Sequence, residues 1–69
     1  MNKTVIIKGM MCPHCEARVK KILENLPEVT EAIVSFKEGT AILKCTSLVS
    51  DDVIKQVITN DGYEVIEIK

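Results

Sequence analysis

Residues 6–23 read IIKGMMCPHCEARVKKIL, and this stretch changes its character at Gly9. Before the glycine, β-branched residues predict a strand at Lys3–Lys8, with Val5 and Ile7 on one face. After it come two cysteines, separated by two residues, and then a charged segment with regularly spaced apolar residues. The cysteine pair therefore stands where a strand ends and another kind of structure begins.

The segment after the cysteines predicts a helix. Pro13 suits the first helical position, where a missing N–H costs nothing. Beyond it, apolar residues recur at helical spacing, at Val19, Ile22, Leu23 and Leu26. Because Pro27 cannot continue a helix, we expect this helix to span Pro13 to Leu26.

The rest of the chain predicts a hairpin, a second helix and a last strand. Residues 31–45 alternate on both sides of a turn at Glu38–Gly39, which indicates a hairpin. Ser50 can cap a second helix that ends at Gly62, and residues 63–69 alternate again. The order βαββαβ predicts an α+β fold, the ferredoxin-like plait, with a four-stranded antiparallel sheet and two helices on one face.

The plait places the cysteines in a definite neighbourhood. Its strands lie in the spatial order four, one, three, two, with strands three and four running opposite to strand one. We therefore expect Tyr63 near the cysteine pair and Cys45 at the far end of the sheet. Three isoleucines fall on the uncovered face of the sheet: Ile6, Ile33 and Ile42.

Composition narrows the class of protein. The chain has 69 residues, a formal net charge of −1 and 46% hydrophobic residues, so we expect one small domain, residues 1–69, and no enzyme activity. Neither this charge nor the single Tyr and single Phe suits nucleic-acid binding. The apolar run Val5–Ile7 is too short for a signal peptide or a membrane span, which predicts a cytoplasmic protein without direct membrane insertion.

The cysteine pair suits a soft metal ion. In the reducing cytoplasm we expect Cys12, Cys15 and Cys45 as reduced thiols or metal ligands rather than disulfides. Cys12 and Cys15 stand at the positive end of a helix, which favours thiolates, and thiolates select ions such as Cu(I). Structural Zn(II) sites need four ligands, and the sequence offers no second cysteine pair. A two-ligand site stays open to attack by a partner's thiolate, which indicates delivery rather than storage.

The motif GMMCPHC between a strand and a helix, together with GY before the last strand, resembles the heavy-metal-associated domain family, and within it the small bacterial copper chaperones of the CopZ type. The resemblance covers the whole chain. It implies that Cys12 and Cys15 bind Cu(I), that Met10 packs under the loop and that Tyr63 is the family's loop tyrosine. It also implies partners: the amino-terminal metal-binding domain of a copper-exporting P-type ATPase, and in some bacteria a copper-sensing repressor. We expect a monomer without metal and allow a metal-bridged dimer.

Other residues near the motif have more ordinary interpretations. Met11 stands where the family often has Thr or Ser, and we expect it to be exposed rather than to bind metal. His14 should project away from the sulfurs, where it can tune the thiols or face a partner. Cys45 replaces a frequent aromatic and should be a core residue, since cysteine is often buried. Tyr63 either packs against the site or shields the metal from water.

Two other function classes remain open. The CPHC sequence also occurs in thiol-disulfide oxidoreductases of the thioredoxin superfamily, but the βαββαβ order and the missing proline at a strand start opposite the site disfavour that class. A metal-free interaction domain would leave the cysteine pair without a purpose. The cargo itself also stays open, because Ag(I), Hg(II), Cd(II) and Zn(II) are alternatives to Cu(I), either for a carrier or for the metal-binding domain of a transporter.

Overall fold

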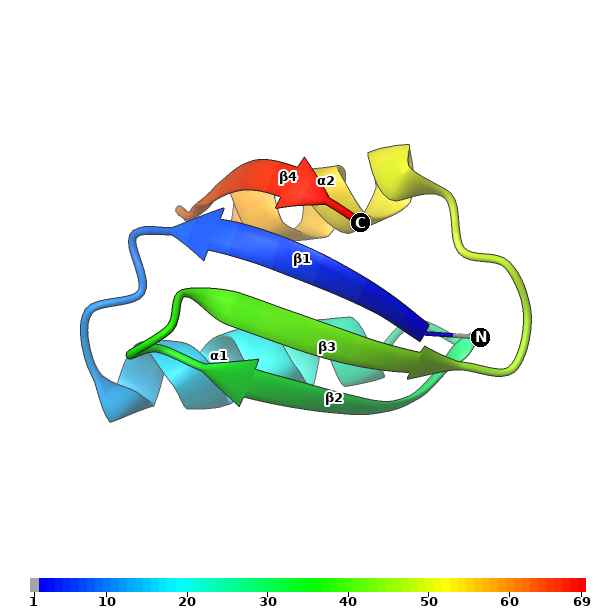
Figure 1. The fold of residues 1–69 in the computed structure, drawn as a ribbon, viewed down its shortest axis with the longest axis horizontal. Helices are drawn as coiled ribbons and strands as arrows, with labels where there is room; N and C mark the ends of the chain where they lie inside the picture. The colour runs from blue at the N-terminus through cyan, green and yellow to red at the C-terminus, as the bar shows by residue number, and fades with distance from the viewer. Residues whose placement is uncertain (1) are drawn as a thin grey trace.

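The computed structural model describes residues 2–69 and has the expected βαββαβ order (Figure 1). Its elements are β1 (Asn2–Lys8), α1 (Pro13–Glu24), β2 (Val29–Ser35), β3 (Thr40–Cys45), α2 (Asp51–Asn60) and β4 (Glu64–Ile68). The sheet has the order β2-β3-β1-β4, and every neighbouring pair is antiparallel. The predicted ferredoxin-like α+β fold and its strand order are confirmed.

The core lies between the sheet and the two helices. Residues of alternate strand positions and of one stripe on each helix are fully or almost fully buried in one cluster, which includes Val5, Val19, Leu23, Ala32, Ala41, Leu43, Ile54 and Ile58. On the opposite face of the sheet, Ile33 and Ile42 lie directly opposite one another on β2 and β3, and both are exposed. The expected division into a covered and an uncovered face therefore holds.

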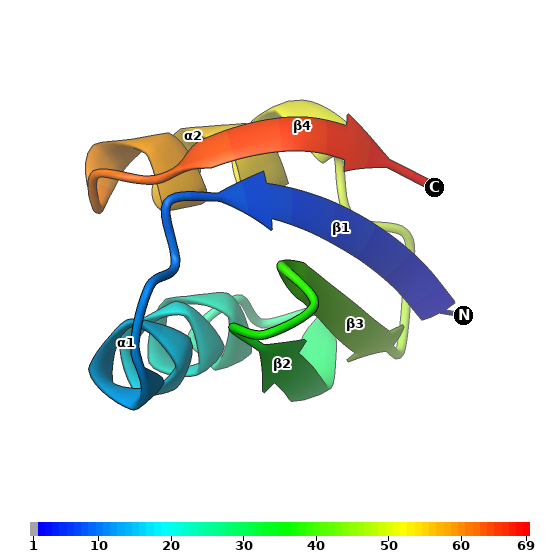
Figure 2. The same cartoon turned by 60° about the vertical axis from the view of Figure 1, so that its left-hand side comes forward.

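Three connections meet at one end of the sheet (Figure 1). They are the β1–α1 loop, the β2–β3 turn and the α2–β4 loop. The register explains this meeting, because Lys8 at the end of β1 lies opposite Glu64, and Ile6 lies opposite Thr40. Cys45 ends β3 at the other end of the sheet, where β1 begins and β4 ends (Figure 2). We call the first the loop end and the second the terminal end.

Helix α1 is shorter than predicted. It ends at Glu24 rather than Leu26, with Asn25 as its C-cap. The N–H of Leu26 turns back to the carbonyl of Leu23, which closes a tighter last turn. The residue before a proline is disfavoured in helical geometry, so Pro27 ends the helix ahead of itself.

The hairpin turn is also longer than predicted. Strand β2 stops at Ser35, so Phe36 belongs to a turn that runs to Gly39. Gly39 has φ +67°, and a Cβ at this position would lie 3.0 Å from the carbonyl oxygen of Ile7. Glycine therefore lets the turn approach β1 closely.

Strand β4 departs from simple alternation because it contains a bulge. The register shifts between Ile6 and Ile7 of β1, which leaves Ile66 as the extra residue of β4. As a result Val65 and Ile68 both pack against the core, although they are three residues apart. Ile66 stays exposed. A bulge of this kind re-aims side chains and cannot be derived from alternation.

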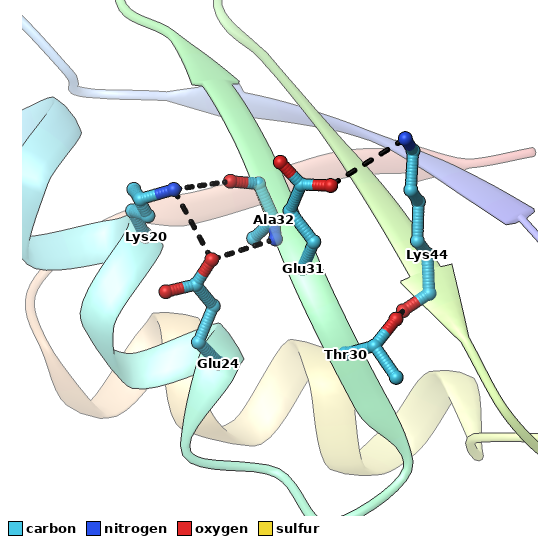
Figure 3. Close-up of polar contacts among 6 residues, drawn as sticks. All are labelled: Lys20, Glu24, Thr30, Glu31, Ala32 and Lys44. Carbon is cyan, nitrogen blue, oxygen red and sulfur yellow. Dashed lines mark hydrogen bonds and ion pairs between the residues drawn. The ribbon is translucent and has the colours of Figure 1, made fainter.

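Side chains of α1 reach the backbone of β2 (Figure 3). Glu24 accepts a hydrogen bond from the N–H of Ala32 at 3.0 Å, and Lys20 donates one to the carbonyl of Ala32 at 3.1 Å. The two side chains also pair with each other at 3.1 Å. The pKa of Glu24 is lowered, chiefly by the Ala32 N–H and then by Lys20. About two turns before Glu24 in α1, Glu16 accepts from the N–H of Phe36.

Helix α2 begins as predicted. Ser50 has extended geometry, and its side chain accepts from the N–H of Asp52, which is the expected N-cap. Among residues 2–69 there is no helix with the length and apolar character that a membrane crossing requires.

Candidate metal site

The loop between β1 and α1 presents the two cysteines at a helix start. Gly9 has φ +106°, which lets the chain leave β1 at an angle that other residues rarely adopt. Met10 is buried beneath the loop, as expected. Cys12 is the N-cap of α1 in extended geometry, and Pro13 takes the first helical position. The carbonyl of Cys12 accepts from the N–H of Cys15 at 3.1 Å, so the first helical turn fixes both cysteines relative to one another.

The sulfurs of Cys12 and Cys15 lie 3.5 Å apart. With metal–sulfur bonds of about 2.3 Å, this separation gives a sulfur–metal–sulfur angle of about 100°, whereas an ion placed straight between the sulfurs needs them about 4.6 Å apart. The Cys12 side chain makes no capping hydrogen bond to α1 that would have to break when the pair widens. The two sulfurs can therefore serve as joint ligands after a side-chain adjustment of about 1 Å.

Tyr63 reaches the site from the end of α2. The N–H of Tyr63 donates to the carbonyl of Ile58, and the N–H of Gly62 donates to the carbonyl of Thr59. These two bonds form a Schellman motif, which requires a residue such as Gly62, with φ +95°, just after the helix. The ring of Tyr63 then lies against Gly9, where a Cβ would be 3.5 Å from its Cδ1 atom.

Hydrogen bonds give Cys15 the character of a thiolate. The pKa of Cys15 falls from 9.0 to about 7, chiefly because the Tyr63 hydroxyl hydrogen-bonds to its sulfur, with further bonds from the Met11 backbone and from Cys12. The same bond to Cys15, together with partial burial, raises the pKa of Tyr63 to about 12. Tyr63 therefore stays protonated at neutral pH and acts as a donor to a sulfur that is about half ionised there.

The remaining residues of the motif do not join the sulfurs. Met11 has 84% of its surface exposed, as predicted, and His14 is exposed as well. Cys45 is buried at the terminal end of the sheet, as predicted. Within residues 2–69, no group of three or more His, Cys, Asp or Glu side chains is arranged to hold a metal ion. All three cysteines lie in this range, and none forms a disulfide.

Two contacts near the site did not follow from the sequence patterns. Arg18 pairs with Asp61 at 3.2 Å, across 43 positions of the chain. Glu16 accepts from the N–H of Phe36 in the β2–β3 turn at 3.0 Å, across 20 positions of the chain. Helix periodicity only finds partners on the same helix, and both of these partners lie on other elements.

The family model described as "Heavy-metal-associated domain" matches residues 4–64. The chain belongs to this family. It is 33% identical to the copper chaperone CopZ of Staphylococcus aureus (strain JH9) over 61 residues, which cover 87% of this chain and 90% of that protein. The solved structure of a copper binding domain from HMA7, a P-type ATPase, superimposes with a TM-score of 0.87 at 32% identity, covering 100% of this chain and 95% of that one.

The similarity extends to pieces of larger proteins. The chain is 38% identical over 58 residues to the mercuric reductase of Serratia marcescens, which amounts to 84% of this chain but 13% of that enzyme. Heavy-metal-associated domains thus occur both as small proteins and as parts of long ones. A relative matched over most of both lengths is named a copper chaperone.

Proposed function

We propose that this protein is a cytoplasmic metallochaperone that binds Cu(I) through Cys12 and Cys15 and passes it to a second thiolate pair. The observation that carries the proposal is the 3.5 Å separation of the two partly exposed sulfurs at a helix start. The receiving pair belongs to the amino-terminal metal-binding domain of a copper-exporting P-type ATPase or to a copper-sensing repressor.

The site favours a small, soft cargo. Two thiolate ligands satisfy Cu(I), while a structural zinc ion requires four ligands. With His14 and Met11 turned to solvent, the approach to the sulfurs is open to another protein's cysteine. Transfer then proceeds by exchange: an incoming thiolate forms a bond to the ion, the bond to Cys12 or Cys15 breaks, and the released sulfur remains as a thiolate.

A second candidate function is transport of another soft ion, above all Hg(II). It is favoured by the 38% identity to a segment of a mercuric reductase. In a second version of this alternative, this chain is the metal-binding domain of a larger protein. Both versions use the same two sulfurs, so they differ in the cargo and the partner rather than in the site.

Anaerobic titration with Cu(I) against a competing chelator tests the proposal. The wild type is compared with the double variant Cys12→Ser/Cys15→Ser, and Cys45→Ser serves as the matched control because it also removes one thiol. We expect tight binding by the wild type and the control and none by the double variant. Parallel titrations with Hg(II) and Zn(II), and an insulin-reduction assay, separate the other functions.

Each contrary result has a definite meaning. Tight Cu(I) binding by the double variant would refute the assignment of the site. The affinity of the protein for each ion is divided by the affinity of a free dithiol for the same ion. If this ratio is larger for Hg(II) than for Cu(I), the proposed cargo becomes Hg(II). Disulfide turnover without metal binding would make the protein an oxidoreductase.

A further inference from the structure

An ion pair joins the two helices beside the cysteine loop. The Nη2 atom of Arg18 on α1 lies 3.2 Å from Oδ1 of Asp61, which is the C-cap of α2. Arg18 follows Cys15 by three positions, so the two side chains are neighbours on the surface of α1. The pair thus links the helix that carries the cysteines to the helix that precedes Tyr63.

Asp61 stands in an unfavourable place for a carboxylate. The C-terminal end of a helix carries partial negative charge, and the last turn of α2 has no basic residue to balance it. The Oδ2 atom of Asp61 is buried and has no hydrogen-bond partner among the described residues. The cation that compensates this carboxylate is therefore Arg18. Accordingly, the pKa of Arg18 is raised, first by its hydrogen bond to Asp61 and less by the charges of Tyr63 and Cys15.

Asp61 is also the residue from which the Tyr63 loop departs. Gly62 and Tyr63 follow it directly, and their N–H groups close the Schellman motif on α2. The backbone of Tyr63 is thus attached to the end of α2 by two hydrogen bonds, whereas its ring lies against Gly9 of the cysteine loop on the other side. Whatever holds the end of α2 against α1 also holds the Tyr63 ring over the cysteine loop.

We propose that Arg18 is a positioning residue whose ion pair with Asp61 holds Tyr63 over the cysteine pair and thereby slows the loss of the bound ion to a competing ligand. This inference rests on the proposed function for its cargo. An attacking thiolate must reach the ion before a bond to Cys15 breaks. A fixed Tyr63 ring limits that approach on one side, and a loosened α2 end lets the ring move away.

The pair is partly exposed, which sets the size of the effect. The side chains of Arg18 and Asp61 are 64% and 23% exposed. Exposed ion pairs contribute little, and we expect Arg18→Ala to speed the removal of Cu(I) by a chelator about threefold. Salt that screens charges, with an anion that does not bind Cu(I), should bring the wild-type rate toward that of the variant.

The decisive experiment is a double-mutant cycle on the rate of Cu(I) removal, followed by stopped-flow absorbance. It compares the wild type, Arg18→Ala, Tyr63→Ala and the double variant, with Lys21→Ala as a control for loss of positive charge on α1. We expect Arg18→Ala to speed the removal of Cu(I) when Tyr63 is present and to have no further effect in the Tyr63→Ala background. The charge reversal Arg18→Asp/Asp61→Arg should restore the slow rate.

A second measurement needs no metal. In the apoprotein, nuclear Overhauser contacts between the Tyr63 ring and the Gly9 α-protons should weaken in Arg18→Ala and persist in Lys21→Ala. If these contacts and the removal rate stay unchanged in Arg18→Ala while the wild type binds Cu(I), the positioning role is wrong. Equal acceleration with and without Tyr63 would also overturn it. If the wild type binds no Cu(I), the proposed function fails, and the nuclear Overhauser result still decides the positioning role.

Discussion

The two ends of the sheet use the same residue type in opposite ways. At the loop end, Cys12 and Cys15 are partly exposed at the start of α1, and their sulfurs are hydrogen-bonded to one another. At the terminal end, Cys45 is 9% exposed and belongs to the hydrophobic core. The chemistry of a cysteine in this protein therefore depends on where the backbone places it.

The ends also differ in how their backbone is built. Among residues 2–69, positive φ angles occur at three glycines, and all of them lie at the loop end: Gly9, Gly39 and Gly62. The terminal end is held instead by side chains, since Lys3 donates to the carbonyl of Val49 at 2.7 Å and pairs with Asp51. The cysteine pair therefore lies at the end where the chain adopts unusual backbone angles, whereas contacts of Lys3 stabilise the opposite end.

The largest expected difference between the ends is in thiol reactivity. With iodoacetamide at neutral pH, Cys12 and Cys15 should be modified at least about a hundred times faster than Cys45, because Cys45 must wait for local opening of the core. Mass spectrometry of digested samples over time measures the three rates. Comparable rates for all three would show that the terminal end is not closed.

The second difference is in stability. Cys45→Ser places a hydroxyl in an apolar site and should lower the free energy of unfolding by about 1–3 kcal/mol, while leaving Cu(I) affinity unchanged. Urea unfolding of the apoprotein and the chelator titration measure the two quantities, with Cys45→Ala as a control that adds no polar group. A clear loss of Cu(I) affinity in Cys45→Ser would contradict the separation of the two ends.

A smaller effect is expected from the glycine that places Tyr63. Gly62→Ala meets no atom within 4 Å, so its cost comes from the φ of +95° and should be about 1 kcal/mol. Because the Schellman motif positions Tyr63, the variant should also release Cu(I) faster. Gly39→Ala is a control for strain at a positive φ. Its Cβ would also lie 3.0 Å from the Ile7 carbonyl oxygen, so it should cost more stability, yet it leaves the Schellman motif intact and should change the release rate less. If both variants release Cu(I) at the wild-type rate, Tyr63 has no part in retaining the ion.

The most subtle difference is in pH dependence. The pKa of Cys15 is about 7 in the folded protein and 9.0 without its partners. Because the folded value is the lower one, the apoprotein gains stability from Cys15 as pH rises from about 7 to 9, and loses it as pH falls through 7. The ¹³Cβ shift of Cys15 should titrate near pH 7, and Tyr63→Phe should move the midpoint toward 9. An unmoved midpoint would remove Tyr63 as the cause.

The fold and the position of the site could be predicted because local signals agreed. Alternating apolar residues indicated the strands, helical spacing indicated the helices, and the two prolines indicated the ends of the first helix. The resulting order βαββαβ is that of the ferredoxin-like plait. The strand order then placed Tyr63 beside the cysteines and Cys45 away from them, as the register confirms.

What could not be predicted depends on contacts between distant elements. The bulge at Ile66 arises where β4 pairs with β1, and the alternation of residues within β4 does not reveal it. The partners Arg18 and Asp61 are 43 positions apart, and either one alone looks like an ordinary surface charge. The available hint in the sequence was Asp61, a carboxylate just before Gly62 with no basic residue in the last helical turn to balance it. This hint does not identify Arg18 as the partner.

The contacts of Lys20 and Glu24 with β2 have a consequence for how copies of this protein meet. Strand β2 borders the sheet, and its outward N–H and C=O groups would otherwise offer a template for a strand of a second molecule. At Ala32 both groups are already occupied by α1, and at Phe36 the N–H is occupied by Glu16. Pairing of a second molecule along this part of β2 is therefore disfavoured by the same helix that presents the cysteines.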